Sequence, residues 1–568
     1  MQQGGNGTEN PVAFARRHEV AEQPAQESPC SDETLLHEAL PQSDKSEVAL
    51  QDGASAPSGE IELKLLVADD RLADFNAAPI IATNARNKGT RTHLKSVYYD
   101  TPERTLRRNG LSLRVRQSGA RFVQSVKAEF GDDPPRHGEW EANVPSIDPD
   151  VGLAIPFIPA KLRSDLERHQ LEAVFTADIH RRTRIIELPS GTVQIAFDHG
   201  FLKSGDRSMP VSEIELELKD GSASAIYELA LRLAEHGSLK PSIRSKAARG
   251  FDLAADAPPV ARKLQKLRLD PSIPLDDAFA AILRSCLHHL LESLPAAEDG
   301  RDPEGVHQLR VSLRSLRSAL DLVRSVGSLS TVDSLQSEAK WLAQNLSAAR
   351  DWDMFQRETL PTIAKACPSV AGFEALEQVT KKRCSAAYHK VRLALAHRRC
   401  SCFVIGLGGW IEARGWRSDV APEDLGGLAE PAINFAGRVL SDQHARVLKR
   451  GRRFNSLTAE DLHRVRLAVK RLRYLADFFL PLYGDRKSVR RFSRKLADLQ
   501  EELGSYNDAA VTGALLEGLS ANSPDSGTAA AAIAGWQAHA SVGFKSHLRN
   551  AWRDFTKTKA PWSRDAQE

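Results

Sequence analysis

The sequence predicts a multidomain α+β chain, strand-rich from about residue 59 to 253 and helical from 275 to about 560. Strict alternation of charged and aliphatic residues predicts the strands, because side chains of a β-strand point to opposite faces with a period of two. A helical period rich in Leu, Ala and Arg predicts the second region. A repeat within that region predicts two pseudo-symmetric halves.

The composition is that of an ordinary globular protein, with 41% hydrophobic and 27% charged residues in 568. The net charge is only +3, so binding of a polyanion must depend on local clusters of basic residues. The sequence has no signal-peptide pattern and no apolar run of about 18 to 20 residues, so we expect no membrane association. Six scattered cysteines without zinc-ligand spacing favour reduced thiols in a cytoplasmic protein: Cys30, Cys286, Cys367, Cys384, Cys400 and Cys402.

Changes in composition divide the chain into five segments. Residues 1–58 are rich in Gln, Glu, Ser, Pro and Gly and are expected to be disordered. The strand-rich domain follows at 59–253, and 254–274 forms a proline-containing linker with a short helix near Ala261 to Leu269. The helical domain occupies 275–560, with halves at about 275–420 and 430–560, and 561–568 is a tail.

Charged residues recur at alternate positions in at least six predicted strands. One such strand alone would most simply have a solvated face. Both signs recur, however, so we expect a closed sheet that turns its charged faces inward, where buried charges need opposite charges or metals as partners. Such an interior suits a polyanion held by basic residues and divalent cations held by carboxylates. The sets that alternate are Glu60/Glu62/Lys64, Arg114/Arg116, Glu139/Glu141, Arg182/Arg184 and Glu213/Glu215/Glu217, with Lys127 in a further strand.

This region resembles the CYTH domain of the triphosphate tunnel metalloenzyme superfamily. The resemblance rests on Glu60-x-Glu62-x-Lys64, Leu113-Arg114-Val115-Arg116, Glu213-x-Glu215-x-Glu217 and Ser245-Lys246-x-x-Arg249-Gly250. It implies an eight-stranded antiparallel β-barrel, a tunnel that binds triphosphate with Mg²⁺ or Mn²⁺. By matching positions, the phosphate-binding residues would be Lys64, Arg114, Arg116, Lys127, Arg182, Arg184 and Lys246, the first three also being catalytic. The metal ligands would be Glu60, Glu62, Glu215 and Glu217, with Glu141 and Asp198 as further candidates.

These residue types suit hydrolysis of a phosphoanhydride, which needs charge neutralisation and in-line positioning more than covalent catalysis. Arginine can engage two phosphate oxygens at once, and Mg²⁺ prefers oxygen ligands. No Walker loop or nucleophile–base arrangement stands out. We expect His93, His137 and His180 to be solvent-exposed or structural rather than catalytic.

The helical region contains a repeated basic helix. His307, Arg310, Arg314 and Arg317 have the same spacing as His463, Arg466, Lys470 and Arg473, and the leading histidines lie 156 positions apart. This spacing places each set along one helix face. Leu309, Leu313 and Leu316 in one copy, and Val465, Val469 and Leu472 in the other, should face the core. A second matched pair, Arg350-Asp351 and Asn507-Asp508, follows at nearly the same offset.

One isolated basic stripe would indicate a solvated face, but two matched copies favour the binding of a polyanion. The region resembles the CHAD domain, which implies two four-helix bundles around a positively charged channel that binds inorganic polyphosphate. Neither histidine has carboxylate or cysteine neighbours at metal-ligand spacing, so we favour phosphate contact. No recognised DNA or RNA module is present.

We therefore expect a metal-dependent inorganic triphosphatase whose helical domain binds polyphosphate. One alternative is a non-catalytic polyphosphate-binding protein. Another is adenylate cyclase or thiamine triphosphatase activity in the same tunnel, although no nucleoside or thiamine pocket is evident. The expected partners are inorganic triphosphate and polyphosphate, without specific nucleic acid. The expected location is the cytoplasm, with association with polyphosphate granules as one option.

Overall fold

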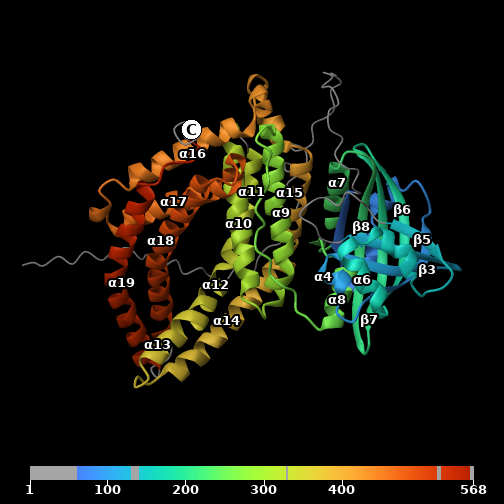
Figure 1. The fold of residues 1–568 in the computed structure, drawn as a ribbon, viewed down its shortest axis with the longest axis horizontal. Helices are drawn as coiled ribbons and strands as arrows, with labels where there is room; N and C mark the ends of the chain where they lie inside the picture. The colour runs from blue at the N-terminus through green and yellow to red at the C-terminus, as the bar shows by residue number, and fades with distance from the viewer. Residues whose placement is uncertain (1–60, 129–139, 328–329, 521–525, 563–568) are drawn as a thin grey trace, which may run out of the picture.

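The computed structural model describes residues 61–128, 140–327, 330–520 and 526–562. The chain forms a strand-rich domain and a larger helical domain, as the sequence predicts, and the two lie side by side (Figure 1). The segment 1–58 expected to be disordered, Glu60, Glu139, His137 and most of the tail lie outside the described residues.

The strand-rich domain is built on one antiparallel sheet of nine strands in the order β5-β4-β3-β2-β6-β7-β8-β1-β9. The predicted eight-stranded closed barrel is therefore not confirmed, since within the described part of the chain no pairing joins β5 to β9. The three-residue β9 already occupies the edge of β1 at which a closing strand would pair. The strands are β1 Glu62–Leu66, β2 Thr90–Asp100, β3 Leu111–Ser118, β4 Arg121–Ala128, β5 Trp140–Val144, β6 Glu172–Leu188, β7 Gly191–Ser204, β8 Arg207–Gly221 and β9 Lys240–Ser242.

Two hydrophobic clusters cover separate parts of the outer face of this sheet. Aliphatic residues of β1, β7 and β8, such as Leu65 and Ile214, pack against α2 (Leu72–Asn76), α3 (Pro79–Asn84) and α7 (Ser224–Ala234). Leu113 and Val115 of β3 belong to the second cluster, under α4 (Thr105–Arg108), α5 (Val151–Ala154) and α6 (Ala160–Arg168). The charged residues that alternate with these aliphatics therefore point to the other face of the sheet.

Helix α8 (Lys246–Ala255) lies on that inner face. Its first turn is capped by Ser245, whose hydroxyl accepts a hydrogen bond from the Ala248 amide. Phe251 packs on Tyr98 and Phe175, two aromatic residues paired across β2 and β6. An added Cβ at Gly250 would lie 2.0 Å from the Phe175 ring, so this glycine allows the close approach of helix and sheet.

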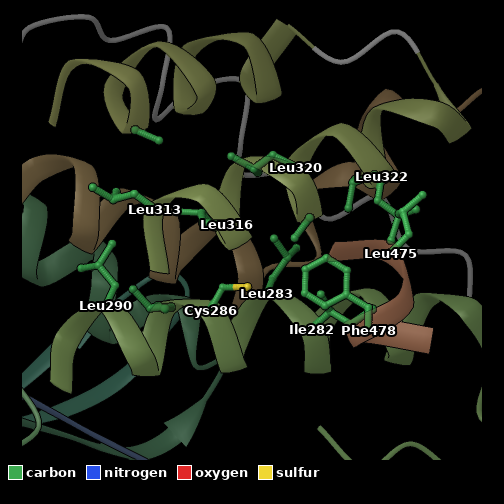
Figure 2. Close-up of a cluster of buried hydrophobic side chains, with 14 of the residues drawn as sticks. Ile282, Leu283, Cys286, Leu290, Leu313, Leu316, Leu320, Leu322, Leu475 and Phe478 are labelled. Carbon is green, nitrogen blue, oxygen red and sulfur yellow. The ribbon is translucent and has the colours of Figure 1, made fainter. Parts of the chain in front are cut away.

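The helical domain has its main core where α9, α10 and α17 pack together. Figure 2 shows Ile282 and Leu283 of α9, Leu322 of α10, and Leu475 and Phe478 of α17 around one apolar space. The helices are α9 Leu275–Asp299, α10 Glu304–Val323, α11 Ser330–Asn345, α12 Ser347–Met354, α13 Leu360–Ala366, α14 Phe373–Ala396, α15 Arg398–Glu412, α16 Ala432–Arg450, α17 Ala459–Phe479, α18 Lys487–Ser520 and α19 Gly527–Thr556.

The two repeats correspond to two helix pairs, α9–α10 and α16–α17, whose second members carry the basic sequences. A second, smaller core lies at the other end of the domain, where α13 and α14 meet α18 and α19. There Leu360 and Leu376 pack with Leu516 and Ile533. The first and second halves thus contact each other through two separate hydrophobic clusters. Figure 1 shows α10 near α17 and, at the other end of the domain, α13 near α19.

The two domains share an interface between α7 and α15. Ile405 of α15 is 1% exposed and belongs to the hydrophobic cluster of the sheet domain. Tyr227 of α7 packs so closely on Gly408 that an added Cβ there would lie 2.3 Å from its ring. Lys240 and Glu298 add an ion pair of 2.5 Å across the interface. The domains are therefore packed on each other as well as joined by the linker.

The linker contains no helix between Ala261 and Leu269, contrary to the prediction. The basic residues of this stretch would repel one another on helix faces, and other contacts replace helical hydrogen bonds. The Arg262 carbonyl lies 3.0 Å from Nε2 of His289 on α9, and Leu269 is buried in the helical core. In the part of the chain that the structure describes, no helix is long and apolar enough to cross a membrane.

Candidate active site

The register of the sheet brings charged residues of seven strands to one face, which we call the charged face. Residues directly opposite each other in an antiparallel pair lie on the same side of the sheet. Lys64 on β1 lies opposite Glu215 on β8, which identifies the face on those two strands. Following the pairs from strand to strand gives its members: Glu62, Lys64, Arg114, Arg116, Lys127, Glu141, Arg181, Asp198, Glu213, Glu215 and Glu217.

Three carboxylates form the most buried part of the charged face. Oxygens of Asp198, Glu213 and Glu215 all lie within 4.8 Å of one another, and the first two side chains are fully buried. Lys246, at the start of α8, places its Nζ 2.6 Å from Asp198 and 2.9 Å from Glu215 and also pairs with Glu213. The carboxylate cluster therefore holds a cation supplied by the chain itself.

Two arginines complete this ion network. Arg181 donates two hydrogen bonds to Asp198, at 2.7 and 2.6 Å, and also pairs with Glu215. Arg249, one turn along α8 from Lys246, pairs with Glu213. Three carboxylates thus face three basic side chains, so the buried charges are balanced.

Mutual attraction in this network outweighs the cost of burial. Burial alone would raise the pKa of Glu215, but the charges of Lys246, Arg181 and Lys64 hold it well below its usual range. Burial alone would lower the pKa of Lys246, whereas Glu213, Asp198 and Glu215 raise it. The groups therefore stay ionised at neutral pH and have charges available for an ionic ligand.

Exposure increases steadily along the charged face from this buried end. On β8 the exposed fraction of the side chain rises from 0% at Glu213 to 17% at Glu215, 21% at Glu217 and 40% at Lys219. Lys64 on β1 is 18% exposed and pairs with Glu62, which is 29% exposed. Helix α8 closes the buried end, so a ligand would approach from the side of Glu62 and Lys219.

The predicted basic residues of β3 and β4 also lie on the charged face. Arg116 donates to Ser96 at 3.1 Å, and Arg114 donates to Ser125 at 3.5 Å. Ser125 in turn donates to Glu141 at 3.2 Å. Lys127 follows on the same side of β4 and is exposed. Serine hydroxyls thus hold the two guanidinium groups in place above the sheet.

Arg182 and Arg184 do not lie on the charged face, so their predicted placement there is wrong. They pair with Phe197 and Ile195, which belong to the outer hydrophobic cluster. The segment from 181 to 184 contains three arginines, and alternation alone does not show which of them faces inward. The cross-strand register decides it, and the inward residue is Arg181.

Sequence reasoning placed Glu213 on the inward face but not among the metal ligands, and it left Arg181 out of the site altogether. A tight turn between Leu188 and Gly191 could have revealed the arginine, because counting outward from it pairs Arg181 with Asp198. The same counting from the turn between Ser204 and Arg207 pairs Asp198 with Glu213. The turn residues Pro189-Ser190 and Gly205-Asp206 were therefore the sequence signals from which the register of these strands could have been predicted.

The basic residues of the helical domain lie on α10 and α17 as predicted, and the apolar residues between them are buried. On α10 all four basic residues are half-buried, and Arg310 donates to Ser347 at 2.6 Å. Nε of Arg314 is buried without a hydrogen-bond acceptor among the described residues. On α17, His463 is exposed, while Arg466, Lys470 and Arg473 are half-buried.

His307 lies within a cluster of positive charge. Burial lowers its pKa, and the neighbouring guanidinium groups of Arg350, Arg314 and Arg310 also lower it, whereas Glu304 acts in the opposite direction. Arg314 also acts electrostatically on Tyr474 of α17, so the two basic helices are near each other at this point. Three guanidinium groups and one imidazole thus gather here, with Glu304 and Asp351 as opposite charges, and a local excess of basic groups suits an anion.

Comparison with known families identifies both domains. The CYTH domain family matches residues 58–251, and the CHAD domain family matches residues 281–517. The chain is thus a CYTH–CHAD protein, with the two domains in that order.

Several individual proteins are similar to this chain. An inorganic triphosphatase of Haemophilus influenzae is 26% identical over 196 residues, which are 34% of this chain and 55% of that protein. An uncharacterised protein of Mycobacterium tuberculosis is 26% identical over 451 residues, 74% of this chain and 80% of its own. The CHAD domain of the plant Ricinus communis is 33% identical, with a TM-score of 0.47, and the match covers 53% of this chain and 98% of that structure. The chain therefore spans about half the length of the triphosphatase that it matches.

The carboxylate cluster fits the divalent cation on which CYTH proteins depend. Its donors are carboxylate oxygens only, which hard cations such as Mg²⁺ and Mn²⁺ prefer. Asp198, Glu213 and Glu215 lie close enough together to share one ion. Glu217 and Glu62, opposite each other on the same face, are the next carboxylates toward solvent.

Proposed function

We propose that the sheet domain hydrolyses inorganic triphosphate with Mg²⁺ or Mn²⁺, and that the helical domain binds polyphosphate. The observation that carries the first part is the carboxylate cluster of Asp198, Glu213 and Glu215 on the same sheet face as Lys64, Arg114 and Arg116. Carboxylates for a metal and basic groups for phosphates are what phosphoanhydride hydrolysis requires. The similarity to an inorganic triphosphatase supports the same substrate class.

Asp198, Glu213 and Glu215 would hold the cation, which when bound supplies charge neutralisation and polarises phosphate oxygens. Arg114, Arg116 and Lys127 would bind phosphate oxygens along the sheet. Lys246 and Arg181 have a second role, because they neutralise the carboxylates while the site is empty. When a metal and a phosphate bind together, both side chains can turn from carboxylate to phosphate oxygens without leaving a buried charge unpaired.

The sharpest test compares Arg181→Gln with Arg182→Gln, since these neighbours lie on opposite faces of β6. We expect Arg181→Gln to lower kcat/KM for tripolyphosphate by roughly 100-fold or more, since it removes a charged phosphate contact of about 3 kcal/mol. Arg182→Gln should leave kcat/KM within about twofold. The measurement is phosphate release with Mg²⁺ or Mn²⁺.

Circular dichroism would establish that both variants are folded. Wild-type protein that releases no phosphate from tripolyphosphate with either metal, yet binds it, would favour the alternative of a non-catalytic binding protein. Equal losses in the two variants would contradict the assigned sheet face. ATP and thiamine triphosphate in the same panel would test the other alternative activities of this site.

Polyphosphate binding by the helical domain rests on the cation cluster around His307. Because burial and three guanidinium groups lower its pKa, this imidazole is neutral at pH 7.5 in the free protein. A bound polyanion favours the charged imidazolium, so affinity should rise as the pH falls through 6.5 and below. We expect affinity for a polyphosphate of about 20 residues to rise severalfold between pH 7.5 and 6.0.

Calorimetric titration at both pH values would measure this effect. His307→Gln should bind more weakly at pH 6.0 and lose most of the pH dependence, and Arg314→Gln should weaken binding at both values. Arg324→Gln is the matched control, because this arginine near the end of α10 pairs with Asp333 at 2.8 Å. Binding that both His307→Gln and Arg314→Gln leave unchanged would place the polyphosphate site elsewhere.

A further inference from the structure

Three histidines form a row across the outer face of the sheet, and we call them the histidine row. His93 on β2 lies directly opposite His180 on β6, which lies directly opposite His199 on β7. Directly opposed residues on neighbouring strands project from the same face with Cβ atoms about 5 Å apart. All three side chains are exposed, and the rings of His93 and His180 stack with centroids 4.4 Å apart.

Asp178 adds a carboxylate to this row. It lies two residues before His180 on the same face of β6, and its Oδ1 is 2.6 Å from Nε2 of His93. One potential ligand atom each from His93, Asp178 and His180 lies within 4.8 Å of the other two. Gly200 keeps β7 against this part of β6, because an added Cβ would lie 2.0 Å from the Asp178 carbonyl oxygen.

This cluster is separate from the charged face. His180 and Arg181 are consecutive residues of β6, so they point to opposite sides of the sheet. The histidine row is bordered by solvent, by Phe201 and by basic side chains. Lys95 and Phe201 lie opposite Asp178, and Lys203 acts on it electrostatically. No residue of the histidine row belongs to the carboxylate cluster or to the basic helices.

We propose that His93, Asp178 and His180 bind a divalent transition metal of the Zn²⁺ class, with His199 as a fourth ligand. Imidazole nitrogens with one carboxylate are ligands that Zn²⁺, Co²⁺ and Ni²⁺ prefer over Mg²⁺ and Ca²⁺. Ligand atoms of a tetrahedral zinc site lie about 3.3 Å apart, given Zn–N bonds of about 2.0 Å. The present ligand atoms lie within 4.8 Å of one another, so metal binding requires the exposed rings to rotate closer together.

The site differs from the carboxylate cluster in the metal that it selects. A nitrogen-rich site on the outer face would take Zn²⁺ even with Mg²⁺ in large excess, whereas oxygen-only ligands would remain with Mg²⁺. The bound metal would link β2, β6 and β7, the three central strands of the sheet. It would therefore stabilise the domain and not take part in phosphate chemistry.

The test titrates the full-length protein with Co²⁺ in the presence of 10 mM Mg²⁺, a concentration of about 10⁻² M chosen to occupy carboxylate-only sites. Visible absorption reports tetrahedral or five-coordinate Co²⁺, and Zn²⁺ competition then gives the zinc affinity. We expect one equivalent in the wild type and in Glu215→Gln, and loss of this equivalent in the double variant His93→Ala/His180→Ala. His169→Ala, an exposed histidine at the end of α6, is the matched control and should bind normally.

Two further measurements keep the test decisive. Tripolyphosphate hydrolysis and circular dichroism of the double variant should match the wild type, because the histidine row is exposed and lies opposite the charged face. His199→Ala should weaken zinc binding by roughly tenfold, and an unchanged affinity would remove His199 from the ligand set. Zinc binding by the double variant with unchanged stoichiometry and affinity, or none by the wild type, would overturn the proposal.

Discussion

At the scale of single residues, Lys246 has the most demanding position in the sheet domain. Its Nζ contacts three carboxylates, and only 14% of its side chain is exposed. Removing one partner of a buried charge network is costly because the remaining charges stay buried without compensation. The lysine therefore stabilises the empty site, whatever it contributes to phosphate binding.

We predict that Lys246→Met lowers the free energy of unfolding by about 3–5 kcal/mol, because it leaves three carboxylates to two arginines. Lys219→Met is the matched control, since this lysine also pairs with a glutamate of the charged face but is 40% exposed, and it should cost at most about 1 kcal/mol. Urea denaturation at pH 7 measures both effects. Mn²⁺ should restore more stability to Lys246→Met than to the wild type. Equal stability of the two variants would show that the network is not energetically important.

Alternation along strands made part of the site predictable. It correctly placed Lys64, Arg114 and Arg116 on one face, because the alternation within a strand shows which of its residues share a face. It failed at Arg182 and Arg184, where basic residues are consecutive and only pairing with β7 determines the face. Alternation within a strand thus predicts which side chains share a face of the sheet. Pairing with strands distant in sequence determines which charged side chains contact each other.

At the scale of secondary-structure elements, α8 connects folding to the site. Its apolar side packs on Tyr98 and Phe175, and its first residue supplies Lys246. The position of this lysine therefore depends on how closely α8 packs on the sheet. Gly250 permits the close packing because it has no side chain.

We predict that Gly250→Ala destabilises the protein by about 1–3 kcal/mol and lowers tripolyphosphate hydrolysis at least tenfold, because the methyl group forces α8 away from Phe175. Gly504→Ala in α18 is the control, since nothing lies within 4 Å of the added Cβ there. That substitution should raise stability by up to about 1 kcal/mol, the usual gain of alanine over glycine within a helix. Thermal unfolding followed by circular dichroism distinguishes them, and an unaffected Gly250→Ala would contradict the close packing.

The elements differ in how far sequence could define them. Long helices such as α10 and α17 follow from their periodicity, and their buried residues were predicted individually. The ninth strand, Lys240–Ser242, and the open sheet were not predicted, because a three-residue edge strand has no period of its own. The helix predicted in the linker is absent for a related reason. Leu269 is buried in the core of the helical domain, and this tertiary contact determines the path of the linker.

At the scale of the whole molecule, the two domains share hydrophobic packing. Ile405 of α15 lies in the cluster that covers β1, β7 and β8, and Tyr227 of α7 packs on Gly408. Such packing couples the unfolding of the domains, because separating them would expose apolar surface on both.

We therefore predict one calorimetric unfolding transition for the wild type and two for Ile405→Asp, in which a buried charge at the interface lacks a partner. Leu393→Asp is the matched control, because Leu393 of α14 is 58% exposed, and it should keep a single transition. Two transitions in the wild type would show that the interface is too weak to couple the domains.

The interface also bears on how this architecture can change in evolution. Gene fusion can join two domains by any tether, and such domains can later separate or exchange partners without damage. Here α7 packs on its own sheet and also on α15, so losing the CHAD domain would expose Tyr227, which would have to be covered again or replaced by a polar residue. Descendants of this chain are therefore expected to inherit the two domains as a pair.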